Sequence, residues 1–201
     1  MPEELGRRER KKLATRRALI DAAAELFTEH GFDGTTVAQI AEKADVSTRT
    51  FFLHFPTKED VLAGEGDART ELGLRAIAEQ VPGEGPDEAF ARAMRVMIDD
   101  GRPEETRLGH LRYRIAQEAP TVRMNVLRRR LETEALFAAA LHDRFRDEID
   151  ELGARATVAA VMAASYAAAT LSIDRGDPPA VLREAMRRAV EIGMWGRRRD
   201  G

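Results

Sequence analysis

The sequence lacks cysteine altogether, and only 5% of its 201 residues are aromatic. Without cysteine the chain has neither a disulfide framework nor a metal site built from thiolates. The shortage of aromatic residues disfavours β-sandwiches and barrels, whose strands are enriched in them. The opening segment, MPEELGRRERKK, has no apolar stretch behind its charges, so we expect no secretory signal. These absences favour a helical protein of the cytoplasm.

Hydrophobic residues nevertheless make up 43% of the chain, enough to bury a core. They recur at spacings of three and four residues, which is typical of amphipathic helices, and proline or glycine marks the joins. The clearest break is VPGEGP, residues 81–86. We therefore expect an all-α fold of about nine helices, at residues 12–30, 37–44, 48–55, 58–79, 87–100, 103–118, 120–145, 148–175 and 178–196.

The most informative stretch is TTVAQIAEKADVSTRTFFLHFPTKED, residues 35–60. Thr36 with a glutamine three residues later forms a capping box, and Ser47 is a good N-cap for the following helix. Two helices of about eight residues joined by a four-residue turn have the geometry of a helix-turn-helix. Phe51 and Phe55 are four residues apart, so they share the face that we expect in the core.

The second helix of this motif begins with polar residues that suit base edges and phosphates in a major groove. Arg49 is placed to contact a guanine through two hydrogen bonds, worth about 1–3 kcal/mol of discrimination. The N–H groups at the helix starts near Thr36 and Thr57 suit phosphates, and Lys58 adds charge. Because any three-helix core needs similar caps, an all-helical protein-interaction module without sequence-specific DNA binding remains the alternative.

A basic run lies between Gly6 and Arg17, although the whole chain has a net charge of -3. Such a run attracts the phosphates of nucleic acid or of a membrane surface, or forms a solvated tail. The run alone does not distinguish between these alternatives. The candidate contacts are Arg7, Arg8, Arg10, Lys11 and Lys12.

The segment GFDGTTVAQIAEKADVSTRTFFLHFPTKEDVL resembles the DNA-binding domain of TetR-family transcriptional regulators, over about residues 16–62. The likeness rests on the TTV sequence that leads into the first helix of the motif, the I-A-x-x-A-x-V-S turn, the T-x-F-x-H-F block and the P-x-K-E-D start of the next helix. It implies a DNA-binding domain at residues 1–62 with a basic N-terminal arm. It also implies a larger helical domain for ligand binding and dimerisation at residues 63–201.

The resemblance also implies roles for individual residues. Two departures from the family pattern matter: Asp45 replaces the usual turn glycine, which aspartate tolerates, and Phe52 lacks the hydroxyl of the usual tyrosine. Phe52 would therefore either stack on a sugar or thymine methyl, or pack within the protein. The residues expected to contact DNA, besides the basic arm, are Thr36, Ser47, Thr48, Arg49, Thr50, Phe52, His54 and Lys58.

Residues 156–173 carry no charge and are mostly alanine, close to the length of a membrane span. Alanine is only weakly apolar and polar residues interrupt the segment, so we expect no membrane but a buried helix that another helix approaches closely. By resemblance, residues 148–196 would form a homodimer interface. The candidate contacts for an unknown small-molecule effector, each of which could equally be a core or surface residue, are Met94, Met97, His110, Tyr113, Arg114, Gln117, Met162, Ser165 and Tyr166.

The four histidines are far apart in sequence, and no pair has the spacing of a metal-binding motif. A small helical enzyme therefore has no supporting constellation, and we expect no catalytic residue, cofactor or metal. The sequence predicts a DNA-binding transcriptional regulator, a repressor released from a palindromic operator by a small-molecule ligand.

Overall fold

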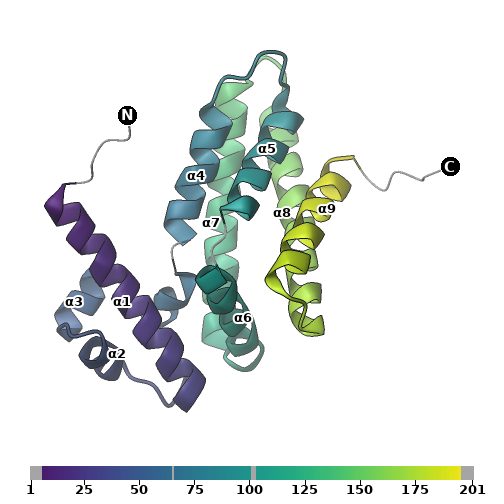
Figure 1. The fold of residues 1–201 in the computed structure, drawn as a ribbon. Coiled ribbons are helices and arrows are strands. Elements are labelled where there is room, and N and C mark those ends of the chain that lie inside the picture. The colour runs from purple at the N-terminus through teal and green to yellow at the C-terminus, as the bar shows by residue number, and fades with distance from the viewer. Residues whose placement is uncertain (1–5, 65, 101–102, 196–201) are drawn as a thin grey trace. The chain divides into compact units, whose positions relative to one another are not determined.

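A computed structural model describes residues 6–64, 66–100 and 103–195, of which 103–106 are described by their backbone alone (Figure 1). All regular structure in these ranges is helical, which confirms the expected all-α class. The elements are α1 Arg7–His30, α2 Val37–Lys43, α3 Thr48–His54, the 3-10 helix η1 Glu59–Ala63, α4 Gly66–Ala78, α5 Pro86–Asp99, α6 Pro103–Glu118, α7 Pro120–Arg144, α8 Glu151–Arg175 and α9 Pro179–Trp195.

The chain divides into two compact units. The first unit contains the residues up to 64 together with 107–126, and the second contains 65–106 together with 127–201. Most of α6 and the beginning of α7 therefore pack with α1, α2 and α3. The helix α7 begins in the first unit and ends in the second, so a division of function at residue 62 stays a prediction.

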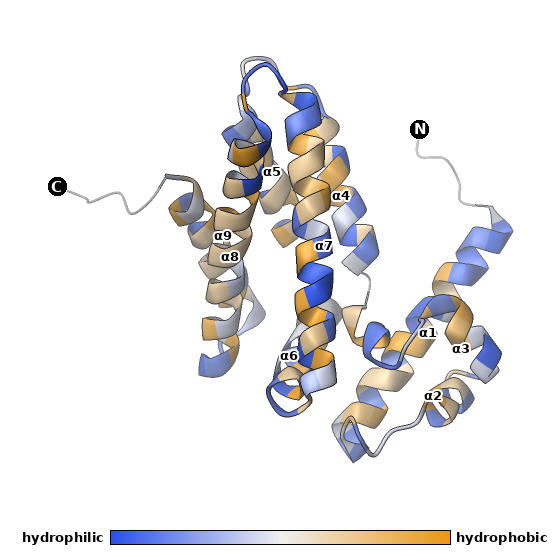
Figure 2. Cartoon of the chain, turned by 180° about the vertical axis from the view of Figure 1, so that it is seen from behind, coloured by the Kyte–Doolittle hydropathy of each residue, from blue (hydrophilic) through white to orange (hydrophobic). Residues whose placement is uncertain are grey.

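The core of the first unit forms around the second half of α1, whose buried residues recur at helical spacing. Figure 2 shows the change of character along this helix, from hydrophilic first turns to a largely hydrophobic second half. Phe51 and Phe55 of the α3 segment are almost completely buried, as the sequence predicts. From α6 and α7, the side chains that join this core include Leu111, Ile115 and Val122.

The prediction of one helix over residues 58–79 is wrong. Thr57 and Asp60 do form the expected cap, since the backbone N–H of Thr57 donates to Asp60 Oδ2 at 3.1 Å. The cap opens only the short η1, because Gly64 takes φ 62° and ψ -132°, a conformation that ends the helix. The helix α4 starts afresh at Gly66.

The start of the first helix also differs from the prediction. α1 begins at Arg7 rather than near Lys12. The basic residues expected in an arm before the helix are therefore its first turns. Residues 1–5 lie outside the described part of the chain.

The second unit packs α4, α5, α8, α9 and the rest of α7 around the buried rings of Phe90 and Phe137, whose centroids lie 5.9 Å apart. Gly73 of α4 makes this close packing possible, because a Cβ there would lie 2.9 Å from the Phe137 ring. Gly193 plays the same part between α8 and α9, since its Cβ would lie 2.9 Å from the Cα of Val161.

Candidate nucleic-acid interface

The helix-turn-helix is fixed by the caps that the sequence predicts. Thr36 accepts the N–H of Gln39 at 3.2 Å, and the Gln39 side chain accepts the N–H of Thr36 at 2.8 Å, which completes the capping box. Asp45 takes φ 53°, the left-handed conformation expected at this turn. Ser47 accepts the N–H of Thr50 at 3.1 Å as the N-cap of α3. These local bonds hold α3 at a defined angle to α2.

The helix α3 buries one face and exposes the other. Phe51 faces the core, whereas Thr48, Arg49 and Leu53 are exposed. Phe52 is 55% exposed, and its ring meets that of Phe51 edge-on with centroids 5.5 Å apart. Its phenyl ring therefore lies on the exposed side of the helix, on the same surface as the polar candidates. Thr50 is half-buried, and its hydroxyl lies 2.9 Å from that of Ser47.

His54, the last residue of α3, is half-buried. Burial of the imidazole lowers the pKa of His54 below its usual value of 6.5, and the charges of Arg16 and Lys12 lower it further. The side chain is therefore neutral at pH 7. A neutral imidazole binds a phosphate by donating an N–H, and the field of a phosphate would raise its pKa again.

Lys58 is held by bonds within the protein. Its ammonium donates to the carbonyl oxygens of Phe32 at 2.8 Å and Thr35 at 3.0 Å, and lies 4.1 Å from the centre of the Phe32 ring. These contacts fasten η1 to the loop between α1 and α2. The sequence did not reveal them, because the partners are 26 and 23 residues away. Phosphate binding by Lys58 stays a prediction.

The basic first turns of α1 present their side chains to solvent. The exposed residues are Arg7, Arg8, Arg10, Lys11 and Lys12. The N-terminal end of a helix is already positive, so cations gathered there repel the helix dipole. Phosphate groups would relieve that repulsion, and phosphate binding by these residues stays a prediction.

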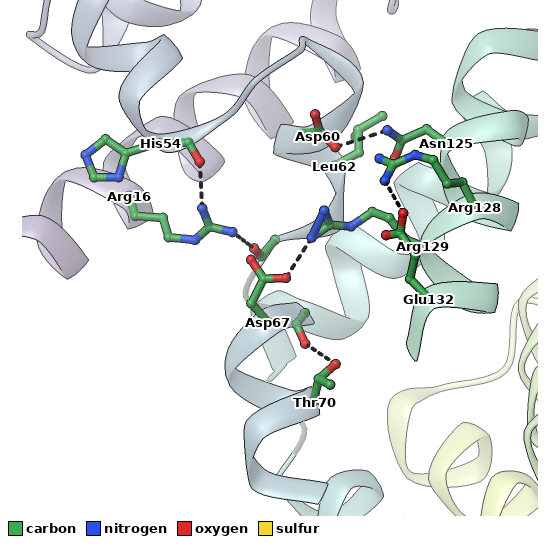
Figure 3. Close-up of polar contacts among 12 residues, drawn as sticks. Arg16, His54, Asp60, Leu62, Asp67, Thr70, Asn125, Arg128, Arg129 and Glu132 are labelled. Atoms are coloured by element: carbon green, nitrogen blue, oxygen red, sulfur yellow. Dashed lines mark hydrogen bonds and ion pairs between the residues drawn. The ribbon is translucent and has the colours of Figure 1, made fainter. Parts of the chain in front are cut away.

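Arg16 is a functional candidate that sequence reasoning missed. Its guanidinium donates to the carbonyl oxygen of His54 at 3.0 Å and to that of Gly64 at 2.9 Å (Figure 3). These partners lie 38 and 48 residues away, and no local sequence pattern predicts such contacts. The sequence signals are its place in the basic run and at the border of an amphipathic helix.

The effector candidates fall into both units. In the second unit, Met94 and Met97 are buried in the core, Met162 packs against it, and Ser165 is buried without a hydrogen-bond partner for its hydroxyl among the described residues. Tyr166 is exposed and lies under the Arg130 guanidinium at 5.1 Å.

The other effector candidates lie on α6 in the first unit. His110 and Tyr113 are half-buried there, whereas Arg114 and Gln117 are exposed. Like those of the second unit, their roles in effector binding stay predictions. Among the described residues, no group of three potential metal ligands comes together.

Comparison with known sequences identifies the helix-turn-helix. The family model for bacterial regulatory proteins of the tetR family matches residues 19–64. The HTH-type transcriptional regulator TcmR of Streptomyces glaucescens is 36% identical over 155 residues, which cover 75% of this chain and 69% of TcmR. The HTH-type regulator RutR of Escherichia coli K12 is 43% identical over 54 residues, about a quarter of each chain.

Solved structures show the same fold. The TetR-family repressor FadR of Thermus thermophilus, solved with lauroyl-CoA, superposes with a TM-score of 0.57 over 92% of this chain and 98% of FadR, at 23% identity. A TetR-family regulator from Rhodococcus sp. gives a TM-score of 0.57 over 90% of this chain and 99% of its own, at 18% identity. These relatives are regulators rather than enzymes. The chain belongs to the tetR family of bacterial regulatory proteins and is a helix-turn-helix transcriptional regulator.

Proposed function

We propose that this regulator is a cytoplasmic homodimeric repressor that reads a palindromic operator with α3 and releases it when a small-molecule effector binds. The observation that carries the proposal is the exposed surface of α3. Three side chains of different chemistry, Thr48, Arg49 and Phe52, stand on a short helix that is capped at its start and packed through Phe51. A rigid helix with such a surface suits a major groove.

In this proposal, α3 supplies the base contacts and its surroundings supply the phosphate contacts. Arg49 donates to a guanine, and Thr48 and Thr50 offer a hydroxyl and a methyl group to neighbouring bases. Phe52 makes an apolar contact with a sugar or a thymine methyl. The groups proposed to face phosphates are Thr36, Ser47, His54, Lys58 and the basic first turns of α1.

The helix α8 supports dimerisation. It is long and apolar enough to cross a membrane by length and composition, yet only 22% of its most apolar window is buried within the chain. Its exposed residues include Leu152, Leu171 and several alanines, and α9 adds Val181, Ile192 and Trp195. A second copy of the same surface would cover these side chains, as isologous interfaces do. The second copy would also supply the second recognition helix that a palindromic operator requires.

The dimer is tested by a charge placed on that surface. We expect the wild-type protein to sediment as a dimer and Ala163→Glu to sediment as a monomer, because an exposed alanine of α8 would bring an unpaired carboxylate into the interface. Met124→Glu adds the same charge at an exposed apolar position of α7 and should leave the dimer intact. A wild-type monomer at micromolar concentration, or one that partitions onto lipid vesicles, contradicts the proposal.

Control by a small molecule is supported by the family and by the course of the chain. FadR of Thermus thermophilus, a TetR-family repressor with a similar fold, was solved with lauroyl-CoA bound. In the present chain, α7 belongs to both units, so a change in the second unit has a helical connection to the first. An effector would act by favouring a conformation whose two reading helices no longer fit adjacent grooves.

Operator recognition is tested with DNA selected by the wild-type protein from a random pool. We expect Arg49→Ala to weaken binding to the selected duplex by about 1–3 kcal/mol, and to relax the preference at one base pair. Arg123→Ala, which removes an exposed arginine of α7 in the same unit, is the matched control and should bind like the wild type. Selection of no sequence by the wild-type protein would reject the proposed function.

A further inference from the structure

The carbonyl group of His54 needs a donor from outside its helix. The helix α3 ends at His54, and the next residue, Phe55, is extended with φ -138° and ψ 114°. The last carbonyl groups of any helix have no partner within it, and here Pro56 brings no N–H to the turn. Arg16 Nη1 supplies the missing donor at 3.0 Å. A residue of α1 thus holds the C-terminal end of α3, the proposed recognition helix.

The second partner of Arg16 lies at the joint between η1 and α4. Gly64 has φ 62°, and a Cβ at this position would lie 2.5 Å from Leu108 Cδ2. A side chain at this position would be strained by the backbone conformation and would meet Leu108 of α6. The Gly64 carbonyl oxygen accepts a hydrogen bond from Arg16 Nη2 at 2.9 Å. One guanidinium therefore joins the end of α3 to this joint, and Figure 3 shows its bond to His54.

The surroundings of Arg16 fix the plane of its guanidinium. The side chain is half-buried, and its guanidinium carbon lies 4.3 Å from the centre of the Phe55 ring. A planar group stacked on an aromatic ring presents its N–H groups in fixed directions. A lysine ammonium can bind two carbonyl oxygens, as Lys58 does, but it donates from one nitrogen atom and lacks the planar pair of donors that Arg16 presents beside the Phe55 ring. The contact is therefore specific for arginine and not merely for positive charge.

The segment between the two carbonyl groups is held from its other side by α6 and α7. Arg112 of α6 donates to the carbonyl oxygen of Leu62 at 3.1 Å, and Asn125 of α7 donates to Asp60 Oδ1 at 3.0 Å. All of these residues belong to the first unit. Because these contacts anchor η1, the two hydrogen bonds of Arg16 hold the end of α3 in a fixed position relative to η1.

We propose that Arg16 is a positioning residue for operator recognition: it sets the direction of α3 by binding the His54 and Gly64 carbonyl groups with one guanidinium. The inference rests on the proposed function, in which α3 makes the base contacts. Arg16 itself touches no base. Its loss lets α3 tilt, so the affinity for the correct sequence falls while the affinity for DNA in general is kept.

The test compares Arg16→Lys and Arg16→Met with the wild type on two duplexes of equal length, the selected operator and a scrambled sequence. We expect both variants to bind the operator about tenfold more weakly, or 1.4 kcal/mol. Binding to the scrambled duplex should stay within about twofold, and the dependence of affinity on salt should not change. Arg123→Lys, the same replacement at an exposed arginine of this unit, should match the wild type.

Two results overturn the inference. Operator affinity of Arg16→Lys equal to that of the wild type means that charge alone suffices. Equal weakening of Arg16→Met on both duplexes, with a salt slope reduced by about 0.9, means that Arg16 contacts a phosphate. If Arg16→Met does not fold, the lysine variant decides.

A second measurement needs no DNA and separates the inference from the proposed function. Amide hydrogen exchange over residues 48–55 should be faster in Arg16→Lys than in the wild type, with α5 unchanged. Unchanged exchange over α3 rejects the inference even if the regulator binds DNA as proposed. Failure of the wild type to select any sequence rejects the proposed function, whatever the exchange shows.

Discussion

Replacing Gly64 by alanine tests whether the joint before α4 has the backbone conformation described above. The residue has φ 62° and ψ -132°, and a side chain held there costs about 1–3 kcal/mol in backbone strain. The new Cβ would lie 2.5 Å from Leu108 Cδ2, the tip of a flexible side chain, which we expect to add about 1 kcal/mol. Alanine also restricts the unfolded chain, which offsets about 0.4–1 kcal/mol. The net loss of stability should be about 1–3.6 kcal/mol.

The loss should appear in the first unit. Hydrogen exchange of the slowest amides in α1 measures the free energy of unfolding of that unit. The only tryptophan of the chain, Trp195, lies in α9, so its fluorescence follows the second unit. Gly66→Ala is the matched control, because it lies two residues away at the start of α4 and its Cβ would meet nothing within 4 Å. Alanine at this helical position should be neutral or stabilising by up to about 1 kcal/mol.

A double variant separates the two causes. Leu108→Ala alone opens a cavity and costs about 2–4 kcal/mol, whereas Leu108→Ala combined with Gly64→Ala relieves the steric contact and keeps the backbone strain. The combined loss should therefore be about 1 kcal/mol smaller than the sum of the single losses. Equal stability of Gly64→Ala and the wild type would refute the assigned conformation of the joint.

Three further predictions follow from the same unit. Asp45→Val should destabilise the turn by about 1–2 kcal/mol in chemical denaturation, because a β-branched residue resists φ 53°, whereas Asp45→Gly should not destabilise it. Lys58→Met should lower the free energy of unfolding by about 1–2 kcal/mol, because two carbonyl groups lose a charged donor, and unchanged stability would show that those bonds contribute nothing. The lowered pKa of His54 means that the unfolded chain takes up a proton more readily, so stability should fall as pH drops through about 6.5, and His54→Gln should remove that dependence.

The features of the site that follow from local chemistry could be predicted from the sequence. The Thr36 capping box, the Ser47 cap and the left-handed Asp45 each depend on residues within a few positions of one another. The burial of Phe51 and Phe55 follows from helical periodicity alone. Such local features determine the position of α3 and its exposed surface.

The features that could not be predicted depend on contacts between distant segments. The cap at Thr57 follows from the local sequence, but the helix it opens ends at Gly64, where a Cβ would meet Leu108, 44 positions further along the chain. The same holds for Lys58, whose carbonyl partners belong to the loop after α1. For η1, the local sequence indicates the cap, whereas the length of the helix depends on the conformation at Gly64.

The same contacts divide the cations that the sequence assigns to DNA into two groups. Lys58 already donates to two carbonyl groups, so a phosphate that binds it must compete with bonds inside the protein. Arg49 and the first turns of α1 present their charge to solvent. Each phosphate contact adds about 0.9 to the slope of log affinity against log salt concentration. Neutralising Arg8 or Lys12 should therefore reduce that slope. Neutralising Lys58 should mainly lower the free energy of unfolding and have little effect on the slope.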